Sequence, residues 1–462
     1  MHEGAAQGQG EDGPVVAIVG GGASGTLTAV HLLRQGPTPP RLVMIDKDGR
    51  HGLGQAYSTQ DARHLLNACA SRMSAVEDDP DHLLRWVRER GLDATDTDYL
   101  PRRLYGEYLR SVLAEARAPW PGDQVTEVTG AVVGLERGAA GERARLRLED
   151  GREIEADAVV LATGNRAPAA WPRIRAGERY VPDPWAPGAV DGRADGSPVL
   201  IVGTGLTMVD LAVTLTGGHP ETVVYAVSRH GLLPAHHRCP PPAPLPIPLP
   251  EGERGLSEIM RAVRAAVRAN GGEWHAVVDG LRSRIPALWA SLSLEDRRLF
   301  LTRVARYWEV HRHRIPPETA VRIDALRDSG RLRVLRGSLV SAVSSGDGLL
   351  VRLDTPQGPR ELRVGHLVNG TGPSHDLGAD PFLNTLFASG AARPDPLGLG
   401  LDAAPDGAVL DASGRPHERV FTLGPTLRGL RYETTAVPEI RAQAAALAPL
   451  LASLPGRVRQ KV

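Results

Sequence analysis

The chain has 462 residues, of which 54 are basic and 54 acidic, so its formal net charge is zero with neutral histidines. This balance argues against a nucleic-acid partner and against binding to an anionic membrane surface. The length predicts two or three domains with an ample core, and no apolar run is long enough to span a bilayer.

The N-terminal residues and the cysteines exclude further classes. Residues 1–13 are rich in glycine, glutamine and acids, which predicts a disordered tail without a signal peptide. The two cysteines, Cys69 and Cys239, are far apart and form no C-x-x-C, so neither a zinc site nor a redox dithiol is expected. We expect no metal, both cysteines as small buried side chains, and a cytoplasmic protein.

A glycine-rich turn near the N-terminus predicts the first of two nucleotide-binding units. Residues 15–19 form a short apolar strand that ends in the G-x-G-x-x-G spacing of Gly20, Gly22 and Gly25. The first glycine allows the tight turn, the second leaves room for a pyrophosphate, and the third lets the helix pack closely. A second apolar run, 42–45, ends in Asp46, where an acid would bind a ribose hydroxyl.

The place of this unit at the start of the fold favours FAD over the alternative of a plain βαβ turn. The predicted FAD contacts around the turn also include Ala23, Ser24 and Lys47.

Helices and a β-meander are expected to follow. Apolar spacing predicts one helix after Asp81 and another beginning near Arg102. Residues 124–158 show short alternating runs, which indicate a β-meander insert. The strand that follows ends in Ala-Thr-Gly at Gly164, another expected FAD contact.

A second nucleotide unit is predicted after the proline-rich link 168–198. Its strand and turn contain Gly203 and Gly205, but Met208 replaces the third glycine, which serves helix packing and not phosphate contact. The next strand ends in Arg229 without an acid, which suits the 2′-phosphate of NADPH; a solvated arginine is the alternative.

The remaining chain predicts a helical insert and a return to the first domain. The insert spans about 253–330 and includes a helix capped by Ser293 whose basic and aromatic residues favour a solvated face or an anion contact over nucleic acid. Strands resume at 331, and the last predicted cofactor contacts are Gly372, Gly424, Thr435 and Ala436. The predicted domains are therefore 14–175 and 331–454 for FAD, and 196–330 for NADPH.

These stretches resemble a bacterial FAD/NAD(P)-binding protein family related to flavin-containing and N-hydroxylating monooxygenases. The resemblance spans nearly the whole chain and is carried by GGGASG, HLLNACASRMSAVEDDPDHLLRW, YLPRRLYGEYL, ATGN, VGTGLTMVD, YWEVHRHRIPP, NGTGPS and YETTAVPEIRAQA. It implies an α/β fold of two dinucleotide-binding Rossmann-like domains, for FAD and NADPH, with a β-meander insert and a helical insert. One departure is Pro425 after Gly424, where relatives often have a Gly-Asp pair.

The resemblance also implies an activity and its site. It implies an NADPH-using monooxygenase that acts through a flavin C4a-hydroperoxide on a small-molecule substrate with molecular oxygen, and leaves a homodimer open. Because the loop LLNACASRMS lies beside the flavin in this fold, Asn67, Arg72 and Ser74 are the catalytic candidates. Unpaired buried arginines need an anion, so Arg72 and Arg102 are the substrate candidates, with Arg103, Arg312 and Arg314 as further cations near the cavity.

A carboxylate-bearing amine such as L-aspartate then becomes the leading substrate. The alternatives are an FAD-dependent NAD(P)H reductase without oxygen insertion and a hydroxylase of a urate-like anion. A flavin-binding scaffold without activity is a third alternative.

Overall fold

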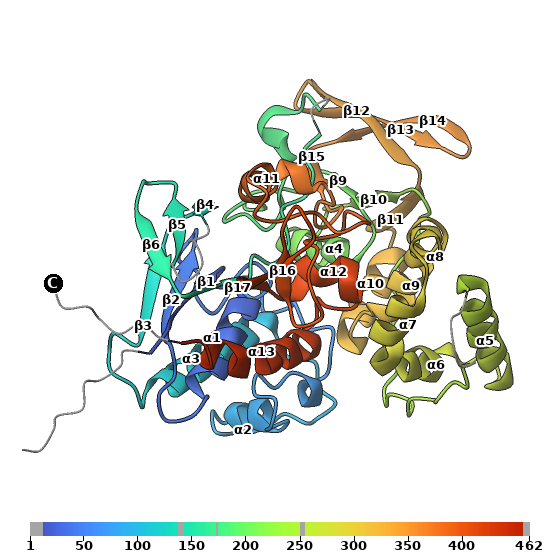
Figure 1. Cartoon of the computed structure of the whole chain (residues 1–462). Helices are drawn as coiled ribbons and strands as arrows, with labels where there is room; N and C mark the ends of the chain where they lie inside the picture. Colours follow the sequence, from blue (N-terminus) through green and yellow to red (C-terminus); the bar gives the residue numbers. More distant parts are fainter. Residues whose placement is uncertain (1–12, 137–142, 172–173, 250–254, 456–462) are drawn as a thin grey trace, which may run out of the picture.

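The computed structural model describes residues 13–136, 143–171, 174–249 and 255–455 (Figure 1). The expected tail lies outside these residues apart from Gly13. The chain forms two mainly parallel sheets, each with its own helices and its own small antiparallel sheet, together with a separate group of helices.

The first unit is built on a six-stranded sheet in the order β16-β17-β7-β1-β2-β3. All neighbours are parallel except β16 and β17. The strands are β1 (Val15–Val19), β2 (Arg41–Asp46), β3 (Val125–Thr129), β7 (Ala158–Leu161), β16 (Ala408–Leu410) and β17 (Pro416–Thr422). The predicted meander thus begins one strand later than expected, since β3 joins the parallel sheet beside β2.

The central strand β1 is buried on both faces, as its unbroken apolar sequence requires. Val16 and Ile18 point to the face covered by α1 (Ala23–Leu33), α3 (Arg102–Arg117) and α13 (Val437–Ala452). Val15 and Val19 point to the other face. That face is covered by α11 (Pro381–Ala388) and by the antiparallel sheet β4 (Val132–Glu136), β5 (Ala144–Leu148) and β6 (Glu153–Ala156).

The second unit repeats this plan on a five-stranded sheet in the order β11-β10-β9-β15-β8. Its strands are β8 (Tyr180–Val181), β9 (Val199–Val202), β10 (Val224–Ser228), β11 (Leu332–Arg336) and β15 (His366–Asn369). The helices α4 (Leu206–Gly218) and α10 (Pro317–Asp328) share its core. Its antiparallel sheet consists of β12 (Ser338–Ser345), β13 (Gly348–Thr355) and β14 (Gly358–Val364).

This pairing corrects the predicted domain boundary at 331. β11 pairs with β10, and β15 pairs with β9, so the chain stays in the second unit until residue 369. It rejoins the first sheet only at β16 and β17. The resumption of strands at 331 therefore marks the antiparallel insert of the second unit, which corresponds to β4–β6 in the first.

The helical insert, residues 256–312, follows β10 and ends before α10, which packs on the second sheet. It contains α5 (Leu256–Ala269), α6 (Trp274–Leu281), η3 (Arg282–Arg284), α7 (Ile285–Ser291), α8 (Leu294–Leu299), the π-helical turn η4 (Phe300–Val304) and α9 (Ala305–Arg312). The predicted cap is confirmed, because Ser293 Oγ accepts a hydrogen bond of 3.1 Å from the Asp296 backbone N–H. In Figure 1, α5 stands at the outer edge of this group.

The remaining short helices are η1 (Ala70–Arg72), α2 (His82–Arg88), η2 (Gly177–Arg179), η5 (Leu377–Ala379), η6 (Gly424–Leu427) and α12 (Arg428–Arg431). No helix among the described residues is both long enough and apolar enough to cross a membrane.

Candidate functional site

The first glycine turn has the geometry that its sequence predicts. Gly20 has φ +111°, and a Cβ there would lie 2.3 Å from the Ala162 carbonyl oxygen. A Cβ at Gly25 would lie 1.9 Å from the Gly20 oxygen, so only glycine lets α1 approach the strand this closely. Gly22 packs against Gly54, because a Cβ added to Gly22 would lie 3.3 Å from the Gly54 Cα. Close packing of the two backbones is therefore a second reason for glycine at position 22, besides access for a phosphate.

The ribose end of this turn contains a carboxylate and an imidazole. Asp46 accepts backbone hydrogen bonds from Gly21 at 3.0 Å and from Asp48 and Arg50, both at 3.0 Å. A carboxylate has about four acceptor positions, so one remains for a ribose hydroxyl. The neighbouring His51, which the sequence did not indicate, has both ring nitrogens buried without a hydrogen-bond partner.

The other predicted contacts of the first unit surround the N-terminus of α1. Ala23 and Ser24 are its first residues, and their N–H groups belong to the first turn, which lacks acceptors within the helix. Gly424, at φ +73°, lies over Ser24, because a Cβ would come within 2.7 Å of Ser24 Oγ. Gly164 has φ +69° with open space around it, and Lys47 is exposed at the start of the loop after β2.

These residues fit FAD. His51 and Asp46 both lie at the glycine turn, since a Cβ on Gly21 would lie 2.8 Å from His51 Nδ1 and 2.9 Å from Asp46 Cβ, and the helix N-terminus that follows favours an anionic phosphate. The helix expected from Thr435 begins two residues later, with Ala436 as the N-cap of α13.

The second turn repeats the first. Gly203 has φ +120°, and a Cβ there would lie 2.1 Å from the Gly370 carbonyl oxygen. This contact corresponds to the one between a Cβ at Gly20 and the Ala162 carbonyl oxygen in the first unit. Gly205 caps α4, with nothing within 4 Å of an added Cβ, and Gly372, at φ +79°, is equally open. Met208, which stands where the third glycine would be, is fully buried, and its side chain packs in the core of this unit.

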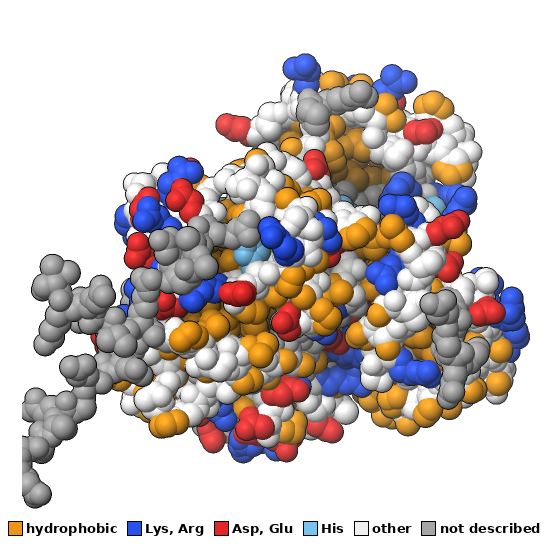
Figure 2. Space-filling model, viewed as in Figure 1, with side chains coloured by type: hydrophobic (Ala, Val, Ile, Leu, Met, Phe, Trp, Pro, Cys, Tyr) orange, Lys and Arg blue, Asp and Glu red, His pale blue; other side chains and the backbone are white. Residues whose placement is uncertain are grey.

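Arg229 lies in a cluster of cations just past the end of β10. Burial and then the charges of Arg306, Arg229 and Arg336 lower the pKa of His230. Arg306 Nε is buried without a hydrogen-bond partner, and none of the three arginines pairs with a described carboxylate within 4 Å. On the face shown in Figure 2, the surface is hollowed below the β12–β14 region, with Lys or Arg side chains at its rim.

A polar cavity lies where the first unit meets the helical insert. It brings together residues distant in sequence: Asn67, Cys69, Arg72, Tyr99, His237, Arg238, Cys239, Asp279, Arg282, Arg312, Arg314 and Ala436. Three predicted site residues, Asn67, Arg72 and Ala436, are therefore neighbours, and the predicted arginines of the insert join them. Cys69 is half-buried and Cys239 exposed, which corrects the expectation that both are buried.

Most of the cations in this cavity already have partners. Arg314 is 3% exposed and donates two hydrogen bonds to Asp279, at 3.1 and 2.7 Å. Arg312 lies 3.2 Å from a Glu433 oxygen, and Arg282 binds Glu439 at 2.9 Å. Arg238 pairs in the same way with Glu273 at 2.7 Å. By contrast, Arg72 makes no ion pair within 4 Å with any carboxylate of the described chain.

Among the lining residues that were not predicted from the sequence, His237 and Tyr99 lie together. His237 lies 5.0 Å from the Tyr99 ring, measured between ring centres, and its Nε2 is 3.0 Å from the Asn67 carbonyl oxygen. Burial, together with the charge of Arg314, lowers the pKa of His237 to about 4, so its imidazole is neutral near pH 7. His237 is two residues before Cys239 in the sequence and Tyr99 is three residues before Arg102, but no motif indicated either residue itself as part of a site.

The structure places Ser74 and Arg102 away from this cavity. Ser74 is fully buried, and its hydroxyl lies 2.6 Å from the Asp79 carbonyl oxygen in a turn, so it cannot reach a substrate. The Arg102 guanidinium pairs with Asp210 on α4 and lies 5.4 Å from the Trp185 ring centre. Arg102 therefore joins the two units and is not available to a substrate.

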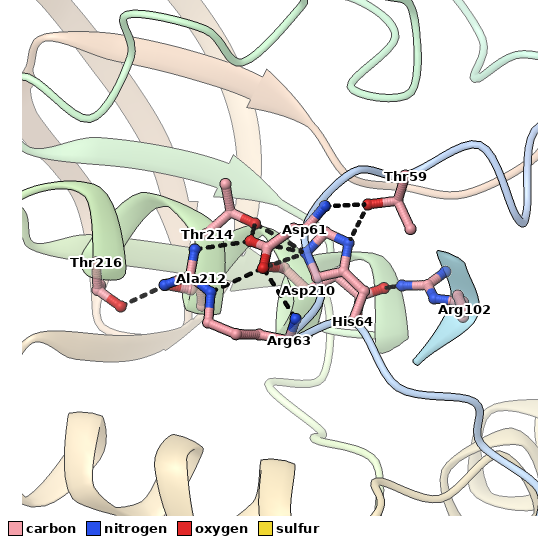
Figure 3. A network of polar contacts seen from close by, with 9 residues as sticks. All are labelled: Thr59, Asp61, Arg63, His64, Arg102, Asp210, Ala212, Thr214 and Thr216. Carbon is pink, nitrogen blue, oxygen red and sulfur yellow. Dashed lines mark hydrogen bonds and ion pairs between the residues drawn. The ribbon is translucent and has the colours of Figure 1, made fainter. Parts of the chain in front are cut away.

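Figure 3 shows the network to which Arg102 belongs. His64 Nε2 lies 2.8 Å from Thr214 Oγ1, which in turn donates to Asp61 at 2.7 Å. Although burial raises the pKa of Asp61, hydrogen bonds from Arg63 and Thr214 hold it well below its usual range. A loop of the first unit is thereby fixed to α4 of the second.

In the described chain, no group of His, Cys, Asp and Glu side chains could hold a metal ion.

Comparison with known proteins agrees with this architecture. Residues 17–166 match the family model described as FAD-NAD(P)-binding. No curated protein sequence matches the chain. The ornithine N-hydroxylase of Kutzneria sp. 744 has a TM-score of 0.63 at 16% identity, with 95% of this chain and 98% of that one covered.

Two further solved structures are similar over nearly the whole chain. L-lysine 6-monooxygenase from Pseudomonas syringae has a TM-score of 0.65 at 16% identity, with 95% and 99% covered. Bacillithiol disulfide reductase from Bacillus cereus reaches 0.51 at 13% identity, with the same coverage. The chain thus carries an FAD-NAD(P)-binding segment in its first third and, over nearly its full length, has the fold shared by these two hydroxylating enzymes and the disulfide reductase.

Proposed function

We propose that this protein is an FAD-dependent, NADPH-using monooxygenase that N-hydroxylates a small carboxylate-bearing amine such as L-aspartate. The observation that carries the proposal is the polar cavity, in which Arg72 lies beside the N-terminus of α13 without an acidic partner among the described residues. The fold neighbours that act on ornithine and lysine support the reaction type. The co-substrates are then NADPH and molecular oxygen.

Each unit has residues that suit one nucleotide. The turn from Gly20 to Gly25, with Asp46 and His51, would hold the FAD phosphates and ribose, and Gly203, Gly205 and Arg229 would hold NADPH. Bound FAD supplies the redox and oxygen chemistry. The protein binds and orients the reactants and keeps water from the reacting centre.

The cavity residues suggest how the amine is held. Arg72 would bind the carboxylate through a charge-assisted pair. Burial keeps the imidazole of His237 neutral, so it adds no positive charge beside the amine. Backbone N–H groups at the start of α13 favour negative charge nearby, because the helix dipole is positive at that end.

The test measures NADPH consumption by the FAD-loaded enzyme with L-aspartate, L-glutamate, L-ornithine and L-lysine. N-hydroxylated product and hydrogen peroxide are quantified in parallel. The proposal expects product in proportion to NADPH for an acidic amino acid. NADPH consumption that is equal with and without every amine, and fully recovered as peroxide, would reject it.

Arg72→Ala adds a residue-specific test. Losing one charge-assisted contact should raise the KM for the amine about tenfold or more without slowing flavin reduction by NADPH. Arg103→Ala is the matched control, because Arg103 is exposed on α3, lies 3.9 Å from Glu107 and does not line the cavity. An equal effect of both substitutions would remove Arg72 from the proposed site.

A further inference from the structure

A second cavity, of different chemistry, lies inside the helical insert. It has a volume of about 290 Å³ and is lined by α5, α6, α7 and α9, the π-helical turn η4 and Tyr432. Its lining is almost entirely carbon and includes Met260, Val263, Trp289, Phe300, Trp308 and Tyr432. It shares no lining residue with the polar cavity.

Three aromatic side chains of the lining have their polar atoms engaged outside the apolar space. Trp289 Nε1 donates to the Gly429 carbonyl at 2.8 Å, and Trp308 Nε1 donates to Glu433 at 2.8 Å. The Tyr432 hydroxyl donates to Glu309 at 2.9 Å. The rings therefore present their carbon faces, which bind apolar groups and offer nothing to water.

Two backbone features at this cavity are unusual. Phe300 and Val304, at the ends of the π-helical turn, both line it, and such turns occur frequently at functional sites. Tyr432 has φ +58° and ψ −64°, a strained conformation for a residue with a side chain. Its ring lies 4.8 Å from the Trp289 ring, measured between centres, so packing in the cavity wall holds the strained residue in place.

The outer wall is charged. On α5, Arg264 lines the cavity and makes no ion pair within 4 Å with a described carboxylate. Arg261 and Arg268 are exposed on the same helix, whose only acid is Glu258. An apolar cavity whose edge carries a cation without a partner among the described carboxylates is complementary to an apolar chain that ends in an anion.

We infer that this cavity binds an amphipathic anion, an aliphatic or aromatic group that carries a carboxylate, at a site separate from the polar cavity. The apolar group lies among Val263, Trp289 and Phe300. The carboxylate pairs with Arg264. The inference does not depend on the reaction proposed above, because it concerns binding alone.

Decanoate serves as the probe, with decanol and decylamine as head-group controls. Binding to the FAD-loaded full chain is measured by calorimetry and by displacement of 8-anilinonaphthalene-1-sulfonate fluorescence. The expected result is one decanoate per chain, and Arg264→Ala should weaken it about two- to fivefold without affecting decanol. Arg261→Ala, on the same helix but not lining the cavity, should leave decanoate binding unchanged.

Filling the cavity gives the decisive comparison. Val263→Trp should weaken both decanoate and decanol at least about tenfold, because the apolar space is lost. Met260→Trp fills the same space from a neighbouring turn of α5. It is used in place of Val263→Trp if circular dichroism shows that Val263→Trp does not fold. Undiminished decanoate binding in a folded cavity-filling variant, or several equal sites per chain, would overturn the inference. So would a concentration-dependent dimer that excludes the probe, since the surface would then belong to a second copy.

Discussion

Replacing Arg229 with alanine should separate the use of NADPH from that of NADH. Arg229 lies just past the end of β10, and with Arg306 and Arg336 it surrounds His230 with positive charge. The 2′-phosphate is the only group that distinguishes NADPH from NADH. The loss of one of these cations should therefore affect NADPH alone.

The structure sets the size of this effect. A hydrogen bond to a charged group contributes about 1.5–3 kcal/mol when the partners are partly sheltered from water. Arg229 is exposed, and two other arginines remain, so the lower end applies, which corresponds to about a tenfold loss in kcat/KM for NADPH. Raising the salt concentration should reduce the difference, because exposed charges are screened.

The assay is anaerobic reduction of the bound flavin by each nucleotide, followed by stopped-flow absorbance. Arg333→Ala is the matched control, since Arg333 is exposed on the next strand, β11, with its guanidinium 5.6 Å from the Tyr225 ring centre. A wild-type preference for NADH, or an equal loss with both nucleotides, would refute the assignment. An equal loss in the control would do the same.

Three further predictions follow from the described contacts. The double variant Cys69→Ser, Cys239→Ser should keep FAD and reduce it at the wild-type rate; loss of NADPH-driven reduction with FAD still bound would instead indicate a thiol mechanism. Because the pKa of His237 falls from 6.5 to about 4 on folding, the unfolded chain takes up a proton between these pH values that the folded chain does not. Stability should therefore decrease as pH falls from 6.5 to 4, by at most about 3 kcal/mol, and urea unfolding of His237→Gln should lack this part of the decrease. Arg102→Ala should lower the free energy of unfolding by about 1–3 kcal/mol by leaving Asp210 unpaired, and a raised KM for the amine at unchanged stability would contradict its structural assignment.

The nucleotide units could be predicted because their requirements are local. A left-handed residue at the end of a strand has to be glycine, and Gly20 and Gly203 both meet that requirement at equivalent contacts. The helix that follows needs only apolar spacing and close packing. A short stretch of sequence therefore contains enough information to locate each turn.

The cavity could be predicted only in part, because its chemistry depends on distant segments. The partner of Arg102 is 108 residues away, and nothing near Arg102 in sequence distinguishes its ion pair with Asp210 from contact with a substrate. The neutral state of His237 arises from burial and from the charge of Arg314, which only the folded chain provides. The boundary at 331 was misplaced for the same reason, since strand pairing decides to which sheet a strand belongs.

Helix α6 contributes lining residues to both cavities. Along α6, Val278 and Leu281 line the apolar cavity, whereas Asp279, next to Val278 in sequence, lines the polar one. Successive helical residues point about 100° apart, so rotation of this helix in one direction would bring the Asp279 carboxylate toward the apolar side. The ion pair between Asp279 and Arg314 opposes that rotation, because Arg314 is almost fully buried and an unpaired charge there is costly. The ion pair therefore has two effects. It neutralises Arg314 in the polar cavity, and it holds the orientation of α6, whose other face lines the apolar cavity.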